Sequence, residues 1–480
     1  SHGRDLICTG ELALDQEGRF LAYRVDQDAN MGAYLHLFNP FVTTNAPLQI
    51  LGGAYAIPAI NCTVRGRYTN TAPLDAYRGA GRPEATYLME RVVDQAAVDM
   101  GLDQAEIRRR NLIPAERLPY QTAMGTTYDS GDFPGTLEAA LAQADWDGFS
   151  SRQGDARARG RLRGIGIAYY IECTLSAPSD DVTVTITAER QVALHVGTQS
   201  NGQSHETTFA QVLADKLGIE AEQVAIRQGD TAEKDTGIGT GGSHSLFMMG
   251  GAAVEAAKTM IDRGKALMAA LYDGSAGDVA YDAGYFALPD SNIRLSLFDL
   301  HDQAAGRDDL DEDLAQGLAC KASYTHQGIT YPNGCHVAEV EVDPETGESH
   351  VVRYTVVDDF GVIVNPTVVA GQVHGGVAQG IGQAITEYAH YDEEGQLITG
   401  SFMDYALPRA DDLPMIDFSY REIPCANNPL GVKGCGEAGT IGALPATTIA
   451  VLDALRREGV RHIDMPATPE AVWRALQAAA

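Results

Sequence analysis

The sequence lacks closely spaced cysteines. None of its seven cysteines forms a Cys-x-x-Cys pair. They are Cys8, Cys62, Cys173, Cys320, Cys335, Cys425 and Cys435. Iron–sulfur clusters and structural zinc sites need clustered thiolates, so the sequence predicts neither in this chain. An odd count in a chain of 480 residues also argues against a disulfide framework, and we therefore expect a reducing, cytoplasmic location.

A basic surface and an export signal are also missing. The formal net charge is −30, from 65 acidic and 35 basic residues, which disfavours nucleic acid and anionic membranes as partners. We find no signal peptide and no apolar run long enough to span a bilayer, so no membrane partner is expected. A Gly-x-Ser-x-Gly elbow and a Walker A motif are absent, which argues against a serine hydrolase and a P-loop enzyme. The histidines at positions 195, 205, 244 and 374 match no standard zinc spacing.

Glycine, in contrast, is abundant, and it accompanies recurring turns between apolar segments. The chain has 51 glycines, clustered in motifs. Alternating apolar residues flank turns at Asp15–Gly18, Ala188–Gln191 and Asp343–Gly347, and a fourth such turn stands at Asp392–Gly395. This pattern is typical of β-hairpins.

Helical spacing of apolar residues follows several of these hairpins. Helices are expected to begin near residues 83, 204 and 243, and the last is expected to run to residue 271. The alternation of hairpins with helices predicts an α+β fold, built of repeated hairpin-and-helix subdomains with mixed sheets. A doubly wound parallel sheet is not expected.

An arginine-rich segment suggests a division of the chain. Phe149–Gly164 mixes five arginines with glycine and serine and is predicted to be a solvated linker, with a surface loop as the alternative. The length allows two to four domains. We therefore divide the chain into a first part, 1–150, and a second part, 151–480. The second part is expected to hold two subdomains that meet near 320–335.

Two glycine-containing segments combine polar side chains with an expected helix start. AYRGAGR, residues 76–82, places Arg78 among small residues, which suits an anionic ligand or an oxo group. A turn with exposed arginines is the alternative. GTQSNGQSHET, residues 197–207, lies between a strand and a helix, and its amides and hydroxyls can hydrogen-bond a polar heterocycle. A polar loop with a helix cap is the alternative there.

Two further segments extend this pattern. GIGTGGSHS, residues 237–245, offers N–H groups and hydroxyls at a helix start and suits a phosphate. A Rossmann site is disfavoured because no parallel strand with an acidic end follows the long helix. GQVHGGVAQGIG, residues 371–382, places Gln372 and Gln379 on one face of a helix, although tight packing of its glycines is the alternative reason for the sequence.

A single carboxylate, Glu437, stands within the run GVKGCGEAGTIG, residues 431–442. Glycine allows the backbone to approach a ligand closely, so Glu437 can lie beside a reacting group without neighbouring side chains blocking access. The alternative is an exposed carboxylate in a loop that enters a helix. The other glycine-rich segments favour a functional site.

Taken in this order, the segments resemble the molybdenum-cofactor subunit of the xanthine dehydrogenase/aldehyde oxidase family. AYRGAGR is most similar to the form II, carbon-monoxide-dehydrogenase-like branch. The resemblance extends over roughly residues 3–455, nearly the whole sequence. It implies that 1–150 and 151–480 are the first and second parts of a molybdenum cofactor-binding region, the C-terminal portion of such a subunit.

The resemblance also implies roles for individual residues. Glu437 matches the family's catalytic carboxylate, which deprotonates a hydroxyl on the metal, and Arg78 matches the catalytic segment beside metal and substrate. The cofactor-binding residues that it implies are Gly79, Ala80, Gly202, Gln203, Gly242, Ser243, His244, Ser245 and Gln372. No side chain is expected to ligate the molybdenum, which the family holds through the pterin dithiolene.

The implied cofactor is molybdopterin with molybdenum, in the cytosine dinucleotide form usual for bacterial relatives. The implied reaction is oxidation of an aldehyde or N-heteroaromatic small molecule with oxygen from water, and the electrons pass to iron–sulfur clusters and FAD. Because the cysteines support no cluster, we expect these groups on an iron–sulfur subunit and an FAD subunit, in a dimer of heteromers. The family's N-terminal half, with its Gly-Gly-Phe-Gly-type loop, has no match here and is expected as a further partner.

Several positions depart from the family pattern. Carbon monoxide dehydrogenases proper carry Cys-Ser-Phe where this chain has Gly79-Ala80-Gly81, so no thiolate is available for copper and CO oxidation is disfavoured. Ala80 also replaces the aromatic residue of purine-oxidising relatives. Ser204 replaces a glycine, and His244 replaces an arginine of the phosphate loop.

Two alternatives of other classes follow from the same residues. The first is a non-catalytic or incomplete assembly chain that needs an N-terminal partner, because the cofactor cage is incomplete and two of its residues differ. The second is a nucleotide-binding enzyme that uses residues 237–245.

Overall fold

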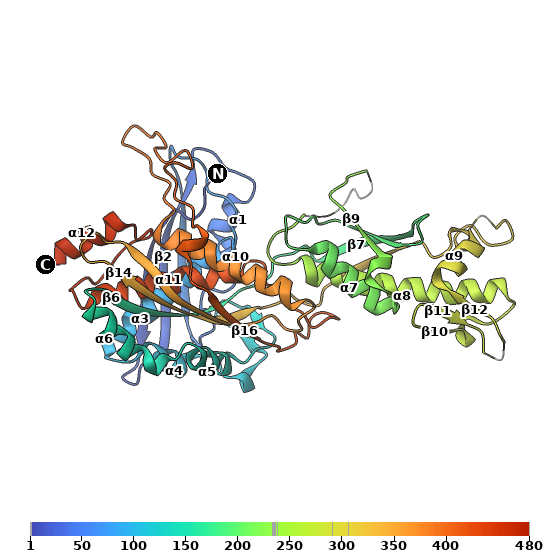
Figure 1. Ribbon diagram of the computed structural model, residues 1–480, viewed down its shortest axis with the longest axis horizontal. Coiled ribbons are helices and arrows are strands. Elements are labelled where there is room, and N and C mark those ends of the chain that lie inside the picture. The colour runs from blue at the N-terminus through green and yellow to red at the C-terminus, as the bar shows by residue number, and fades with distance from the viewer. Residues whose placement is uncertain (1, 233–236, 238, 290, 306, 480) are drawn as a thin grey trace.

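The computed structural model describes residues 2–232, 237, 239–289, 291–305 and 307–479. It has a larger body, which contains both termini, and a narrower lobe that extends to one side (Figure 1). The lobe is one continuous stretch of chain, from β7 to β13, and the body contains the segments on either side of it. The two segments that connect lobe and body lie together, since Thr174 and Thr330 exchange hydrogen bonds of 3.0 Å (Thr174 N–H to Thr330 O) and 2.9 Å (Thr330 N–H to Thr174 Oγ1).

The body is built of two main sheets and their covering helices. Its strands are β1 (Leu6–Leu14), β2 (Phe20–Gly32), β3 (Ile60–Tyr68), β4 (Tyr120–Gln121), β5 (Thr127–Tyr128), β6 (Leu162–Ile171), β14 (Asn333–Val342), β15 (Ser349–Asp359) and β16 (Ile416–Arg421). Its helices are α1 (Asn39–Thr43), α2 (Asn45–Leu48), α3 (Arg82–Met100), α4 (Gln104–Asn111), α5 (Phe133–Gln143), α6 (Phe149–Ala158), α10 (Pro366–Ile385), α11 (Ala438–Arg456) and α12 (Pro469–Ala479).

The lobe has one sheet covered by two helices and a small sheet at its tip. Its strands are β7 (Ser179–Ile186), β8 (Val192–Val196), β9 (Val224–Gln228), β10 (Ala280–Asp282), β11 (Tyr285–Ala287), β12 (Arg294–Ser296) and β13 (Cys320–Thr325). Its helices are α7 (His205–Leu217), α8 (Ser245–Leu271) and α9 (Leu297–Ala304). The tip, drawn in yellow in Figure 1, contains β10, β11, β12 and α9.

One topology occurs three times. Each main sheet contains an antiparallel hairpin (β1–β2, β7–β8 or β14–β15), followed in the chain by a helical segment and a strand that pairs in parallel with the hairpin (β3, β9 or β16). The predicted α+β fold with repeated hairpin-and-helix units and mixed sheets is therefore confirmed, as are the three hairpin turns and the three helices. The fourth turn, Asp392–Gly395, forms no pair of strands, because only an isolated bridge joins Tyr391 to Leu397.

Helix α11 is the centre of the body. It packs against β6, β14, α10 and α3, and nearly all of its residues are buried. A Cβ at Gly164 or Gly166 of β6 would lie 2.2 Å from a carbonyl oxygen of α11, so only glycine allows this approach. In the described part of the chain α11 is also the one helix long and apolar enough to cross a bilayer, but 94% of that apolar window is buried inside the body, as in a core helix of a globular protein.

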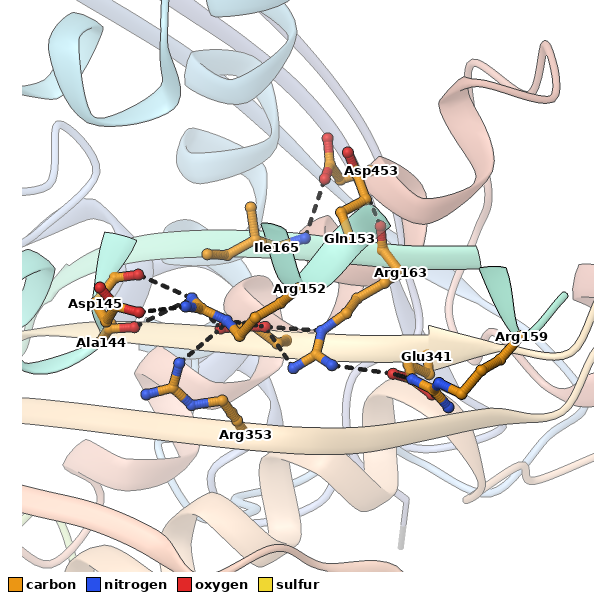
Figure 2. A network of polar contacts seen from close by, with 11 residues as sticks. Ala144, Asp145, Arg152, Gln153, Arg159, Arg163, Ile165, Glu341, Arg353 and Asp453 are labelled. Carbon is orange, nitrogen blue, oxygen red and sulfur yellow. Dashed lines mark hydrogen bonds and ion pairs between the residues drawn. The ribbon is translucent and has the colours of Figure 1, made fainter. Parts of the chain in front are cut away.

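The prediction that Phe149–Gly164 is a linker is wrong. Residues 149–158 form α6, and the segment then enters β6. Its arginines are not simply solvated, because Arg152 and Arg163 each contact Glu339 of β14 at 2.7 Å, and Arg353 of β15 contacts the same carboxylate at 3.3 Å. Figure 2 shows these arginines converging across the strands. Sequence spacing alone could not reveal a carboxylate almost two hundred residues away.

We expect Glu339→Gln to lower the free energy of unfolding by about 3–5 kcal/mol, because it leaves three guanidiniums around a buried, uncharged amide. The Glu339 side chain is only 2% exposed. Chemical denaturation measures the change. Arg159→Gln is the matched control, since Arg159 pairs with Glu341 at 2.6 Å in the same network but is 57% exposed, so solvent screens the pair. Equal effects of the two variants would contradict the assigned role of Glu339.

Candidate active site between the two lobes

A cavity of about 600 Å³ lies where the lobe meets the body. The lobe contributes residues from the loops before α7 and α8, and the body contributes residues from Phe360 through α10 and from the loop before α11. The lining residues include Arg78, Gly202, Gln203, Gly241, Gly242, Ser243, Ser245, Phe360, Gln372, Gln379, Cys435 and Glu437. The glycine-rich segments of the sequence therefore meet at one place, although they are distant along the chain.

Four helices begin at this cavity, and three of them, α7, α8 and α11, lack the side-chain cap that Asn365 gives to α10. The residues that precede these three, Ser204 before α7, His244 before α8 and Glu437 before α11, make no side-chain capping bond to the helix. The N-terminal ends of helices carry partial positive charge and offer N–H donors, so the cavity favours an anionic or electron-rich ligand.

Glycine leaves the backbone bare along the cavity wall. A Cβ at Gly202, Gly241 or Gly371 would meet no atom within 4 Å. These positions therefore border open space, in contrast to the glycines of the core, where a Cβ would clash. Bare backbone around an open space is the arrangement that a large, polar ligand needs for close contact.

Glu437 is fixed at the wall by groups from three elements. Its Oε1 accepts a hydrogen bond of 2.9 Å from the Gly79 N–H, and its Oε2 pairs with the buried guanidinium of Arg82. The Ser243 hydroxyl lies 3.4 Å from Oε2 and accepts a bond of 3.1 Å from the Glu437 N–H. The side chain is 13% exposed, so a ligand in the cavity can reach a carboxylate whose orientation is already set.

Arg78 connects the first segment with α10 and the loop before α11. Its Nε donates to the Gly436 carbonyl at 2.5 Å, and its Nη1 donates to Gln379 Oε1 at 3.0 Å. Its Nη2 donates to the carbonyl and the side-chain oxygen of Gln372, at 3.0 and 3.2 Å. The guanidinium thus contacts both glutamines on the face of α10 that their seven-residue spacing indicates. Tight packing of glycines is therefore not the only role of the segment 371–382.

Most of the predicted site residues are brought together. The cavity wall contains Arg78, Gly202, Gln203, Gly242, Ser243, Ser245, Gln372 and Glu437. It does not contain Gly79, Ala80 or His244: Gly79 lies behind Glu437, and the His244 ring is buried against the Gly241 carbonyl. Their part in cofactor binding stays a prediction. Of the predicted segment 237–245, Ile238 lies outside the described residues.

Two charged residues of the site were not singled out from the sequence. Arg82, the second arginine of AYRGAGR, is fully buried and pairs with Glu437, while Glu172 follows β6 and is also fully buried. The proximity of Arg82 to Arg78 in the motif could have indicated the first. For Glu172 the available sign was a single acidic residue directly after a long apolar strand.

The donor set fits a pterin with a phosphate-bearing end. The cavity offers backbone N–H groups, side-chain amides and hydroxyls at three helix starts, next to bare glycine backbone. In the described part of the chain there is no group of three or more His, Cys, Asp and Glu side chains placed to hold a metal ion. The arrangement therefore suits a cofactor that carries its own metal ligands.

Comparison with known proteins agrees with this geometry. Residues 1–112 match a family model described as a molybdopterin cofactor-binding domain, and residues 139–414 match a second model with the same description. The second match alone covers more than half of the 480 residues.

Curated relatives match along nearly the entire chain. The carbon monoxide dehydrogenase large chain of Hydrogenophaga pseudoflava is 34% identical over 99% of this chain and 61% of its own length. The 6-hydroxypseudooxynicotine dehydrogenase complex subunit gamma of Paenarthrobacter nicotinovorans is also 34% identical, with the same two coverages. The nicotine 6-hydroxylase large subunit of the same organism is 33% identical over 99% of this chain and 60% of its own length. The chain thus spans about three fifths of these relatives.

Solved structures match equally well. Quinoline 2-oxidoreductase from Pseudomonas putida 86 superposes with a TM-score of 0.91 at 32% identity, and the Cu,Mo-CO dehydrogenase with 0.90 at 30% identity. Both matches cover 99% of this chain and 62% of the other chain. From the family models, the shared fold and the convergence of the glycine-rich segments on one cavity, we conclude that the chain belongs to the molybdopterin cofactor-binding domain family of the xanthine dehydrogenase and CO dehydrogenase type.

Proposed function

We propose that this chain is the cofactor- and substrate-binding part of a molybdenum hydroxylase, with Glu437 as general base. The observation that carries the proposal is the position of Glu437, a carboxylate held by Arg82 and the Gly79 N–H at the edge of a large cavity. A fixed, partly exposed carboxylate can accept a proton from a bound group without first losing hydrogen bonds to water.

We assign the residues around the cavity to two roles, binding of the cofactor and positioning of other side chains. Gly202, Gln203 and the loop 241–245 would hold the pterin and its phosphate end through N–H groups and hydroxyls, and Gln372 would contact it from α10. When bound, the molybdenum cofactor supplies the redox chemistry, in which the substrate loses two electrons and gains oxygen that derives from water. Arg78 orients Gln372 and Gln379, and Arg82 keeps the Glu437 carboxylate aimed into the cavity.

For the substrate we propose an aldehyde or an N-heteroaromatic compound. Two relatives are named for nicotine hydroxylation and quinoline oxidation, which supports the heteroaromatic class. Other relatives are named for carbon monoxide. This chain has Gly79 and Ala80 beside Glu437, and neither offers a thiolate for a second metal, so we do not extend CO oxidation to it.

The cofactor form, partners and location belong to the same proposal. We propose a cytosine dinucleotide form, iron–sulfur and FAD subunits as electron acceptors, and a complementary N-terminal half, assembled as a dimer of heteromers in the cytoplasm. The relatives named as large chains or complex subunits support partner chains. Exposed apolar side chains, among them Leu37, Phe402 and Met403, give such partners a surface. We also keep the division into 1–150 and 151–480, with subdomains that meet near 320–335, as a proposal.

Glu437→Gln should lower turnover by about 10²–10⁴-fold, because an amide cannot accept the proton. Molybdenum content should stay at the unsubstituted level, since Gln keeps the shape of the side chain. The measurement is steady-state kinetics with metal analysis, on the chain purified with its partners. Glu458→Gln, at the exposed opposite end of α11, is the control and should change neither. Full activity of the Glu437→Gln enzyme would overturn the proposal, and an absence of molybdenum from the unsubstituted complex would favour a non-catalytic assembly chain.

Gly241→Val should abolish cofactor retention while the fold remains intact. The new side chain enters open space, so the thermal unfolding midpoint of the cofactor-free protein should not fall, but the cavity loses volume beside α8. Gly154→Val is the matched control, because a Cβ there also meets nothing within 4 Å but lies on α6, outside the cavity lining. Pterin and molybdenum content measured after purification distinguish the two variants. Normal cofactor content of the Gly241→Val protein would show that this loop does not border the cofactor.

A further inference from the structure

A second carboxyl group lies behind Glu437. Glu172 directly follows β6, and its side chain is fully buried. Along β6 it continues the alternation of Ala168 and Tyr170, whose side chains belong to the core around α10 and α11. Neither carboxylate oxygen of Glu172 accepts a hydrogen bond of ordinary geometry within the described chain, although the Ser243 hydroxyl and Arg82 lie nearby. An ionised carboxylate that is buried without donors is costly, so its protonation state needs an explanation.

Two carboxyl groups share one guanidinium at this point. Arg82 Nη2 pairs with Glu437 Oε2 and lies 3.7 Å from Glu172 Oε1. All three side chains are buried or nearly so, at 0% exposure for Arg82 and Glu172 and 13% for Glu437. With both carboxyls ionised, the group would carry a surplus negative charge away from water, and the cost of such a charge falls when one proton is retained.

Apart from Arg82, the other ionisable groups around Glu172 form no ion pair with it within the described chain. They are Arg78, Tyr170, Cys173 and Cys435, with the Ser243 hydroxyl as a polar neighbour. Arg78 hydrogen-bonds only uncharged groups, Gly436 and the two glutamines of α10, and it forms no ion pair with Glu172 in the described chain. Its positive charge therefore offsets the surplus only from a distance. Burial raises the pKa values of the tyrosine hydroxyl and the two thiols, so these groups stay neutral and add no positive charge.

The surroundings favour Glu172 as the site of the proton. Glu437 receives the Gly79 N–H and the short contact with Arg82 and also reaches the cavity, so it has the donors that a carboxylate requires. Glu172 has none of these. Burial, followed by the nearby charge of Glu437, raises the pKa of Glu172 to about 8.

We propose that Glu172 is a protonated positioning residue, which holds the one proton of the Glu172–Glu437 pair and thereby keeps Glu437 ionised beside Arg82. The role in catalysis depends on the proposed function of Glu437, whereas the protonation of Glu172 does not. As a neutral acid, Glu172 can also donate its O–H toward Glu437. When Glu172 loses its proton at alkaline pH, two like charges face each other across Arg82 and the position of the base is disturbed.

The first test is the protonation state itself, measured by infrared spectroscopy on the chain with its partners. We expect a carbonyl band of a protonated carboxyl that disappears as the pH rises through about 8 and is missing in the Glu172→Gln protein. Asp453→Asn is the control, because burial raises the pKa of Asp453 only to about 6, and its band should disappear at lower pH. A band that persists unchanged in Glu172→Gln at pH 7, with no other difference, would overturn the proposal.

Stability gives a second readout that requires no cofactor. The pKa of Glu172 in the folded protein lies above the ordinary value of 4.5, so the folded state holds this proton more tightly than the unfolded chain does. The contribution is therefore complete below pH 4.5 and is lost as the pH rises toward 8. Glu172→Gln removes this loss, so its unfolding free energy should fall less than that of the unsubstituted protein over the same range. An identical pH dependence of the two proteins would contradict a retained proton.

The third readout is the pH profile of turnover in the loaded complex. Gln mimics the neutral acid, so Glu172→Gln should keep the rate at pH 7 within about threefold and move the alkaline decline to higher pH. A rate at pH 7 that falls as far as in Glu437→Gln would mean that Glu172 acts as an anion, and the proposal would be wrong. If the unsubstituted complex shows no turnover but the infrared band behaves as expected, only the proposed function of Glu437 fails.

Discussion

The position of α11 governs the rest of the body and the site. Its backbone lies against β6 and α10 at distances that only glycine permits, with Gly164 and Gly166 on one side and Gly376 and Gly380 on another. Cores on both faces of β6 then hold the helix in place, since alternate residues of that strand pack in different apolar clusters. Because Glu437 immediately precedes α11, tight packing of this helix fixes the base of the proposed site to within the freedom of one side chain.

The site also depends on a buried guanidinium that contacts two carboxyl groups instead of one. Arg82 contacts the carboxylates of Glu437 and Glu172, and Arg78 holds α10 to the loop before α11. Both arginines come from one segment, AYRGAGR, whose glycines allow the chain to turn sharply ahead of α3. Positive φ angles at Gly79, Ala80 and Gly81 accompany this turn, from which Arg82 reaches Glu437 and Arg78 reaches Gly436 and α10.

Local patterns predicted the elements well, and long-range contacts explain the failures. Turns flanked by alternating apolar residues correctly indicated three hairpins, because period and turn chemistry are local properties of the chain. The segment Phe149–Gly164 was mistaken for a linker because its arginines find their carboxylates on distant strands (Figure 2). In the site, motif residues such as Arg78 and Glu437 could be named from sequence. Glu172 could not, since a single acid after a strand has no meaning until the fold places Arg82 beside it.

The lobe has its own apolar core and joins the body through two adjacent crossings near Thr174 and Thr330. The cavity between them is lined by both units, which are also joined by the contacts of Ser243 with Glu437 and of Gln211 with Asn365. A molecule that fills this space contacts the loops of the lobe and α10 of the body at the same time. It therefore connects the lobe to the body. A ligand that binds one orientation of the lobe more tightly than others stabilises that orientation by its binding free energy. The angle between lobe and body then depends on the ligand as well as on the polypeptide.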